Sequence, residues 1–212
     1  MMFLNPTKAL IFRIVHVRNL PWIVDHGLHC PNSSNQDPNY VSIGSASLIK
    51  KRAHRTVPIP PGGTLSEYVP FYFTPFSMML YNIKTGHGGI TRRANEEIAI
   101  IVSSIYRVRE LGLPFVFTNQ HAYAVDTDFY SDVAELTKVD WPLLQGRDFK
   151  TDDRDPGKQL RYQAEALIHR HVLLEAILGV ACFNDITKQN LETQLNNEHQ
   201  RVVIKTTPKW YF

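Results

Sequence analysis

The sequence predicts an α+β fold built on a mixed or antiparallel sheet, and three observations support this class. Short runs of β-branched and other apolar residues, typical of strands, occur at 9–17, 98–103 and 113–117. Segments in which apolar residues recur at helical spacing lie between these runs. Long stretches rich in Asn, Ser, Pro and Gly, such as 31–47, connect the elements and are expected to form loops.

The 212 residues are expected to form one domain, over 1–212, with a substantial core. Cys30 and Cys182 lie far apart and lack the spacing of a zinc site. No stretch resembles a signal peptide, and no apolar run approaches membrane-spanning length. These features predict a reduced, cytoplasmic protein without a membrane segment.

The first hundred residues are expected to begin with a strand and a helix. The strand covers 9–17, and Asn19 and Gly27 are placed to cap and to end the following helix. A short basic segment at 48–55 is predicted to be helical and follows a long loop. Prolines bound a further strand at 69–75.

The rest of the chain is predicted to alternate short strands with helical segments. Phe129, Val133 and Leu136 have the spacing of one helix, and 146–158 is charged and loop-like. The remaining expected elements are strands at 98–103, 113–117 and 201–205, a helical turn at 105–111 and a helix at 186–196.

Glu165 stands out because its neighbours Ala164, Ala166, Leu167 and Ile168 are all apolar. A buried carboxylate is costly unless it is paired, hydrogen-bonded or used. One interpretation is that Glu165 begins a helix and faces water. The other is that the fold buries Glu165 for a functional purpose.

Several reaction classes lack their motifs in this sequence. There is no glycine-rich phosphate loop, no serine-hydrolase elbow and no HExxH, and neither cysteine has a neighbour that would activate it. His169 and His171 have no nearby acidic or cysteine partner, so we expect no metal site.

Residues 1–120 carry twelve Lys/Arg against six Asp/Glu, a balance that suits an anionic ligand or nucleic acid. A carboxylate, arginines and aromatic residues remain, and such groups stabilise developing positive charge and bind polyphosphates.

Several spaced motifs, in order along nearly the whole chain, resemble the DarT toxins. These motifs lie at 12–22, 51–52, 57–64, 68–75, 79–81, 113–118, 161–168 and 209–212. DarT proteins are NAD-dependent ADP-ribosyltransferases that modify bases in single-stranded DNA and are neutralised by the macrodomain antitoxin DarG. The resemblance therefore implies an ADP-ribosyltransferase-like split mixed sheet, with NAD as co-substrate in the cleft and no metal.

The resemblance also implies roles for individual residues. Glu165 aligns with the catalytic glutamate of the family, and Arg52 with the arginine that contacts NAD and is thought to take the proton of the acceptor base. Arg13, Ile14 and Val15 occupy the first-strand position beside NAD. Some members have His and Thr where this chain has Arg13 and Val15, so backbone contacts are expected there.

The irregular region 119–161 resembles the substrate-recognition loop of the family. Within or near it, His121 and Tyr123, with Tyr130, are expected to stack on bases. Three arginines are expected to contact DNA phosphates: Arg92, Arg93 and Arg154.

The preferred interpretation is a toxin that transfers ADP-ribose to thymine in single-stranded DNA, with single-stranded DNA and a DarG-type antitoxin as partners. The same chemistry on guanine, RNA or protein stays open. So does a nucleic-acid-binding domain without catalysis.

Overall fold

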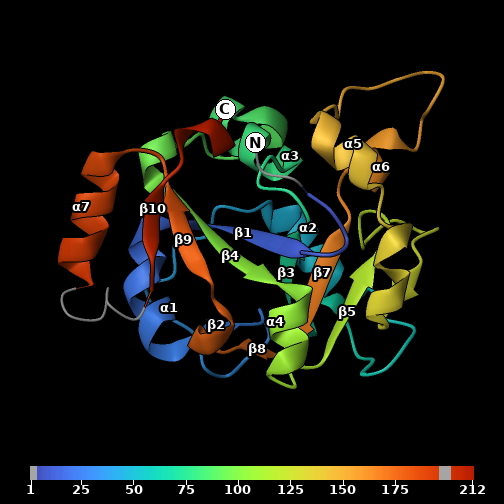
Figure 1. The fold of residues 1–212 in the computed structure, drawn as a ribbon, viewed down its shortest axis with the longest axis horizontal. Helices are drawn as coiled ribbons and strands as arrows, with labels where there is room; N and C mark the ends of the chain where they lie inside the picture. Colours follow the sequence, from blue (N-terminus) through green and yellow to red (C-terminus); the bar gives the residue numbers. More distant parts are fainter. Residues whose placement is uncertain (1–3, 196–201) are drawn as a thin grey trace.

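The computed structural model describes residues 4–195 and 202–212, and its centre is an eight-stranded sheet in the order β10-β9-β4-β1-β3-β7-β5-β6 (Figure 1). Neighbouring strands are antiparallel except β10 and β9, which are parallel. The predicted α+β class with a mixed sheet is therefore confirmed. The strands are β1 (Leu10–His16), β3 (Tyr68–Tyr72), β4 (Ile98–Ser104), β5 (Phe115–Thr118), β6 (Phe129–Tyr130), β7 (Glu165–His169), β9 (Gly179–Cys182) and β10 (Ile204–Thr206).

Short helices surround this sheet, and a two-stranded sheet, β2 (Leu28–His29) with β8 (His171–Val172), lies beside it. In Figure 1, α7 lies along the edge formed by β9 and β10, while α5 and α6 lie near the other edge. The helices are α1 (Leu20–His26), α2 (Ala46–Arg52), α3 (Met78–Thr85), α4 (Ile105–Glu110), α5 (Trp141–Gly146), α6 (Lys158–Arg161) and α7 (Asp185–Gln194). No helix in the described part of the chain has the length and apolar character needed to cross a membrane.

The sheet is split between β1 and β3. Strand β1 pairs with β4 along its whole length, from Leu10 to His16, but pairs with β3 only at Phe12 opposite Tyr72. Pro70 has no N–H to continue the ladder. Instead its carbonyl accepts a 2.8 Å hydrogen bond from Nη1 of Arg13. The two strands therefore separate beyond Phe12, and the gap is bridged by a side chain.

The core lies on both faces of the central strands. Most residues of β4 and β7 are buried, as expected for continuous apolar runs that are covered on both sides. The largest fully buried side chains are Tyr68, Tyr162, Phe12, Phe71, Phe73 and Phe117.

Two interpretations of local structure were wrong. Glu165 begins strand β7 and not a helix, and it is buried. Phe129 lies in β6, where it pairs with Thr118, and the 3₁₀ helix Val133–Lys138 follows separately. Asn19 and Gly27 hold the N-cap and C-cap positions of α1 as expected, but the Asn19 side chain makes no capping hydrogen bond and instead exchanges hydrogen bonds of 3.0 and 2.9 Å with the backbone of Val41.

The other predicted elements are present with shifted bounds. The basic segment forms α2, the turn after β4 forms α4, and the polar helix forms α7. The predicted ends at 196 and 201 lie outside the described residues, and the closing strand is β10.

The histidines make stability depend on pH. Burial lowers the pKa of His16, His29, His121 and His169 below 6.5. The folded protein thus holds these rings neutral, whereas the unfolded chain takes up protons as the pH falls through 6.5. The free energy of unfolding is expected to be constant above about pH 7.5 and to decrease toward about pH 5.5. Urea unfolding at several pH values measures this, and the change should be smaller in His121→Gln. An unfolding free energy that rises on acidification would contradict it.

Candidate active site

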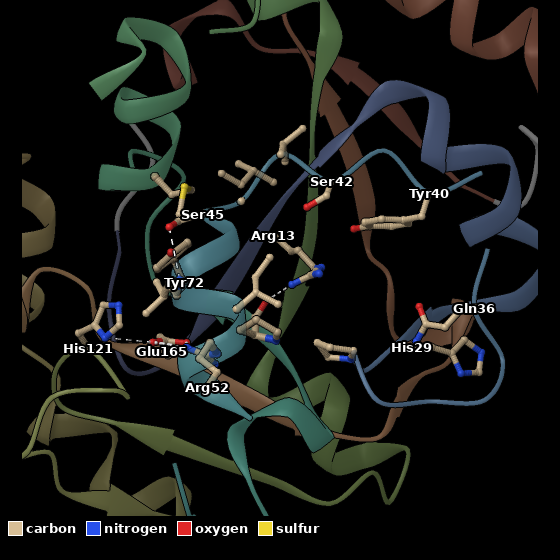
Figure 2. Close-up of a pocket in the computed structure, with 18 residues that line it drawn as sticks. Arg13, His29, Gln36, Tyr40, Ser42, Ser45, Arg52, Tyr72, His121 and Glu165 are labelled. Carbon is tan, nitrogen blue, oxygen red and sulfur yellow. Dashed lines mark hydrogen bonds and ion pairs between the residues drawn. The ribbon is translucent and has the colours of Figure 1, made fainter. Parts of the chain in front are cut away.

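Glu165 is the buried charged group around which the candidate site is built. It is only 2% exposed and begins β7, opposite Tyr72 of β3. Nη1 of Arg52 lies 3.0 Å from Oε2 and 3.2 Å from Oε1 of Glu165 (Figure 2). The N–H of Ala122 donates a 3.0 Å hydrogen bond to Oε1. The carboxylate therefore has an opposite charge and a backbone donor, which offset the cost of its burial.

Thr118 fixes the backbone next to this carboxylate. Its hydroxyl accepts a hydrogen bond from the Glu165 N–H (3.1 Å) and donates one to the Gln120 carbonyl (2.6 Å). Thr118 itself is fully buried at the end of β5. One hydroxyl thus joins the start of β7 to the turn that supplies the Ala122 N–H.

Arg52 is the last residue of α2, and its side chain is 12% exposed. The helix begins at Ser45, whose hydroxyl accepts a hydrogen bond from the Leu48 N–H. While Nη1 pairs with Glu165, Nη2 is buried without a hydrogen-bond partner among residues 4–195 and 202–212. An unpaired buried donor is costly, so this N–H suits a hydrogen-bond acceptor bound in the cavity that Arg52 lines.

A cavity of about 330 Å³ extends from this ion pair. At one end are Glu165, Arg52 and His121, and Figure 2 shows Tyr40 and Gln36 at the other end, beyond Arg13. The walls come from β1, β3, α2 and the loop that Asn19 holds through Val41. The full lining is Arg13, Ile14, His29, Pro31, Gln36, Tyr40, Ser42, Ile43, Gly44, Ser45, Leu48, Ile49, Arg52, Pro70, Tyr72, Met79, His121 and Glu165.

The three residues predicted on the first strand differ in position. Arg13 and Ile14 line the cavity where β1 and β3 separate. The Nε of Arg13 is buried and unpartnered within the described residues, as Nη2 of Arg52 is. Val15 is fully buried, and its side chain packs into the hydrophobic core. It therefore does not line the cavity.

His121 presents a neutral ring to the cavity. Its Nδ1 lies 4.0 Å from Oε1 of Glu165, but Nδ1 accepts a 3.1 Å hydrogen bond from the Tyr123 N–H. Since Nδ1 acts as an acceptor, we interpret the 4.0 Å approach as proximity and not as an ion pair. Burial lowers the pKa of His121, which agrees with a neutral ring.

The other residues predicted to contact DNA are not gathered at the cavity. Arg92 and Arg154 are exposed, and Arg93 pairs with Glu97 at 3.1 Å. Tyr123 is half-buried against a small apolar cluster, and Tyr130 stacks on Phe117. The roles of these residues in DNA binding stay predictions.

Arg55 was not predicted as a site residue. Its Nη2 donates hydrogen bonds to the carbonyls of Ala124 (2.9 Å) and Val125 (3.2 Å). Arg52 and Arg55 therefore both hold the 119–125 segment, one through Glu165 and the other directly. The only feature of the sequence that could have pointed to Arg55 was its position three residues after Arg52.

Arg55→Ala is expected to loosen the segment that supplies the Ala122 N–H. Amide hydrogen exchange of residues 121–125 should become faster, because two carbonyls lose their donor. Arg55→Lys should restore part of the protection, and Lys51→Ala, an exposed change on the nearby helix α2, should have no effect. Unchanged exchange in Arg55→Ala would show that the loop does not depend on this contact.

Comparisons with known proteins identify the family. The model of the family described as "ssDNA thymidine ADP-ribosyltransferase, DarT" matches residues 12–212. A DNA ADP-ribosyl transferase of Escherichia coli O127:H6 is 51% identical over 209 residues, covering 99% of this chain and 96% of that protein.

Two solved structures have the same fold. Thermus sp. 2.9 DarT in complex with ADP-ribosylated ssDNA has a TM-score of 0.90 and 30% identity, with all of both chains covered. Thermus sp. 2.9 DarT in complex with NAD+ has a TM-score of 0.86 and 30% identity, covering 98% of this chain and 100% of that one. The predicted ADP-ribosyltransferase-like fold is thereby confirmed, and the chain belongs to the DarT family of DNA ADP-ribosyltransferases.

Proposed function

We propose that this protein transfers ADP-ribose from NAD to a thymine base in single-stranded DNA and releases nicotinamide. Family membership supports the reaction class, and the relatives bind NAD+ and ADP-ribosylated ssDNA. The observation that carries the proposal is the Glu165 carboxylate, held by Arg52 and the Ala122 N–H at the end of the cavity.

The cavity has the chemistry that NAD requires. Arg13 and Arg52 place two cations on one cavity, and each has a buried N–H without a partner in the described part of the chain. Guanidinium groups bind phosphate oxygens well, so the positive charge of both side chains and the Nε–H of Arg13 suit the diphosphate. Tyr40, 40% exposed at the far end, offers an aromatic face for a ring of the dinucleotide.

The proposed role of Glu165 is to stabilise positive charge on the ribose. Cleavage of the bond between nicotinamide and ribose gives the sugar oxocarbenium character, as in glycoside cleavage. A fixed carboxylate nearby stabilises this charge and also accepts a hydrogen bond from a ribose hydroxyl. Because its two contacts already orient the carboxylate, little reorganisation is needed during the reaction.

Arg52 is proposed to orient and stabilise the acceptor base. A guanidinium keeps its proton under ordinary conditions, so Arg52 is poorly suited to act as a base. With Nη1 committed to Glu165, Nη2, which has no hydrogen-bond partner among the described residues, remains available to donate to the base as the base loses its proton to water. His121 adds a second donor, because the use of Nδ1 as acceptor leaves the ring proton on Nε2.

Membership of the DarT family also supports a protein partner. We propose that a DarG-type macrodomain antitoxin neutralises this protein. A single-stranded substrate agrees with the chemistry, because a paired and stacked base hides its reactive edge.

Glu165→Gln is expected to lower DNA modification by at least about 10²-fold while preserving the fold, because the amide lacks the negative charge that stabilises the ribose cation. The measurement is the mass of each oligonucleotide after incubation with NAD. Glu175→Gln, an exposed change outside the cavity, is the matched control and should retain full activity. Full labelling by a folded Glu165→Gln protein would contradict the assigned role.

The acceptor is tested with oligonucleotides that contain a single thymine, guanine, cytosine or adenine, and with an RNA of the same sequence. Only the thymine-containing DNA strand should gain one ADP-ribose, with one nicotinamide released for each. Exclusive labelling of guanine, of RNA or of protein would contradict the proposed substrate.

A further inference from the structure

A second hollow, of about 700 Å³, lies on the other side of the first turn of α3 from the NAD-binding cavity proposed above. Met79 lines the first cavity, whereas Met78 and Tyr81 line the second. The opposite wall is the loop that connects α5 to α6, at 147–150. Figure 1 shows α3 beside these two helices.

Three aromatic rings form one wall of this hollow. Tyr81, Phe149 and Phe212 contact one another edge to face, with ring centroids 5.5 to 5.9 Å apart. Tyr81 is 41% exposed and Phe212 38% exposed. The Tyr81 hydroxyl has no hydrogen-bond partner within the described ranges. Exposed aromatic faces gathered in a concave site are typical of surfaces on which bases stack.

Two cations that form no ion pair among the described residues lie beside these rings. The Arg147 guanidinium lies over the Phe76 ring, 3.5 Å from its centroid. Arg147 and Lys150 are both exposed, and neither forms an ion pair with a carboxylate in the part of the chain that the structure describes. The one acidic side chain of the lining, Asp148, forms an ion pair with Lys158 and also lies within electrostatic reach of Lys150. The side chains of the lining, together with Lys158, therefore carry more positive than negative charge, which complements phosphate.

The loop that forms this wall is fixed to α6. Nε2 of Gln159 donates a 2.9 Å hydrogen bond to the Phe149 carbonyl, and Arg161 makes hydrogen bonds of 2.9 and 2.6 Å to Asp155. The ring of Phe149 also packs against buried Tyr162, with centroids 5.1 Å apart. Tyr162 lies only three residues before Glu165, so the hollow and the carboxylate are built on one continuous, ordered segment.

We propose that this hollow binds a nucleotide of the DNA strand that flanks the modified base. The base stacks on the exposed ring of Tyr81, with Phe149 and Phe212, whose rings stand edge to face against it, beside the base, and its phosphate contacts Arg147 and Lys150. Aromatic faces combined with exposed cations match the two components of a nucleotide, which favours nucleic acid over a protein partner. The inference rests on the proposed function and adds a second contact with the same strand. Substrates too short to reach the hollow should bind more weakly.

The test is DNA binding by fluorescence anisotropy without NAD, so that no chemistry occurs. The probes are oligonucleotides that contain one thymine, with abasic residues replacing the flanking bases one at a time. At one flanking position, loss of the base should weaken binding to the wild-type protein by about 5- to 140-fold. Tyr81→Ala should bind the intact strand as weakly as the wild-type protein binds that abasic strand, with no further loss when the base is removed.

Two further variants support the interpretation. Arg147→Gln should weaken binding whatever the flanking base is, and should reduce the slope of log K against log salt by about one. Tyr106→Ala, on α4 and outside both hollows, is the matched control and should bind as the wild-type protein does. NAD cleavage measured without DNA should be unchanged in Tyr81→Ala, which shows that the variant is folded.

Equal dependence on the flanking base in Tyr81→Ala and the wild-type protein would overturn the inference. Unchanged binding and salt dependence in Arg147→Gln would overturn it as well. Neither result would affect the proposed function, which fails only if the wild-type protein does not label thymine DNA from NAD. Since binding is measured without NAD, the two failures are distinguishable.

Discussion

The ion pair between Arg52 and Glu165 is the interaction on which the rest of the site depends. It joins the end of α2 to the start of β7, 113 residues apart in sequence, and buries both side chains almost completely. Breaking a buried pair by removing one partner leaves an uncompensated charge and typically costs about 3–5 kcal/mol. The structure offsets the cost of burial with the Ala122 N–H, which comes from the segment that also carries His121. One carboxylate thus fixes the positions of α2, β7 and the segment that carries His121 and Ala122 relative to one another.

The split in the sheet gives this carboxylate access to a ligand. If β1 and β3 paired along their whole length, Arg13 would have no cavity to line. Because pairing is confined to Phe12 and Tyr72, a cavity opens between the strands, and the Arg13 side chain spans it to the Pro70 carbonyl. Two guanidinium groups then contribute to one cavity that also holds a carboxylate. This arrangement suits a dinucleotide whose diphosphate is anionic and whose ribose becomes cationic during the reaction.

Much of the fold could be predicted from the sequence, because local patterns determine the strands. The apolar runs of β1, β4 and β5 report burial directly, and the apolar neighbours of Glu165 correctly raised the possibility of a buried carboxylate. The spacing of Phe129, Val133 and Leu136 predicted one helix, and this was wrong. Phe129 pairs with Thr118 in the sheet, and this pairing outweighs the local periodicity.

Contacts between distant segments could not be predicted in the same way. The hydrogen bonds of Arg55 to Ala124 and Val125 have no local signature. Charge alone marked Arg92, Arg93 and Arg154, yet it does not determine which face of the protein they occupy.

The most direct test of the central claim is a crystal structure of this protein with an NAD analogue that resists cleavage. The account predicts the nicotinamide-side ribose at the Glu165 end, with a ribose hydroxyl about 2.6–3.2 Å from the carboxylate. The diphosphate should lie between Arg13 and Arg52, and the adenine toward Tyr40. A reversed dinucleotide, with adenine against Glu165 and nicotinamide beside Tyr40, would contradict it.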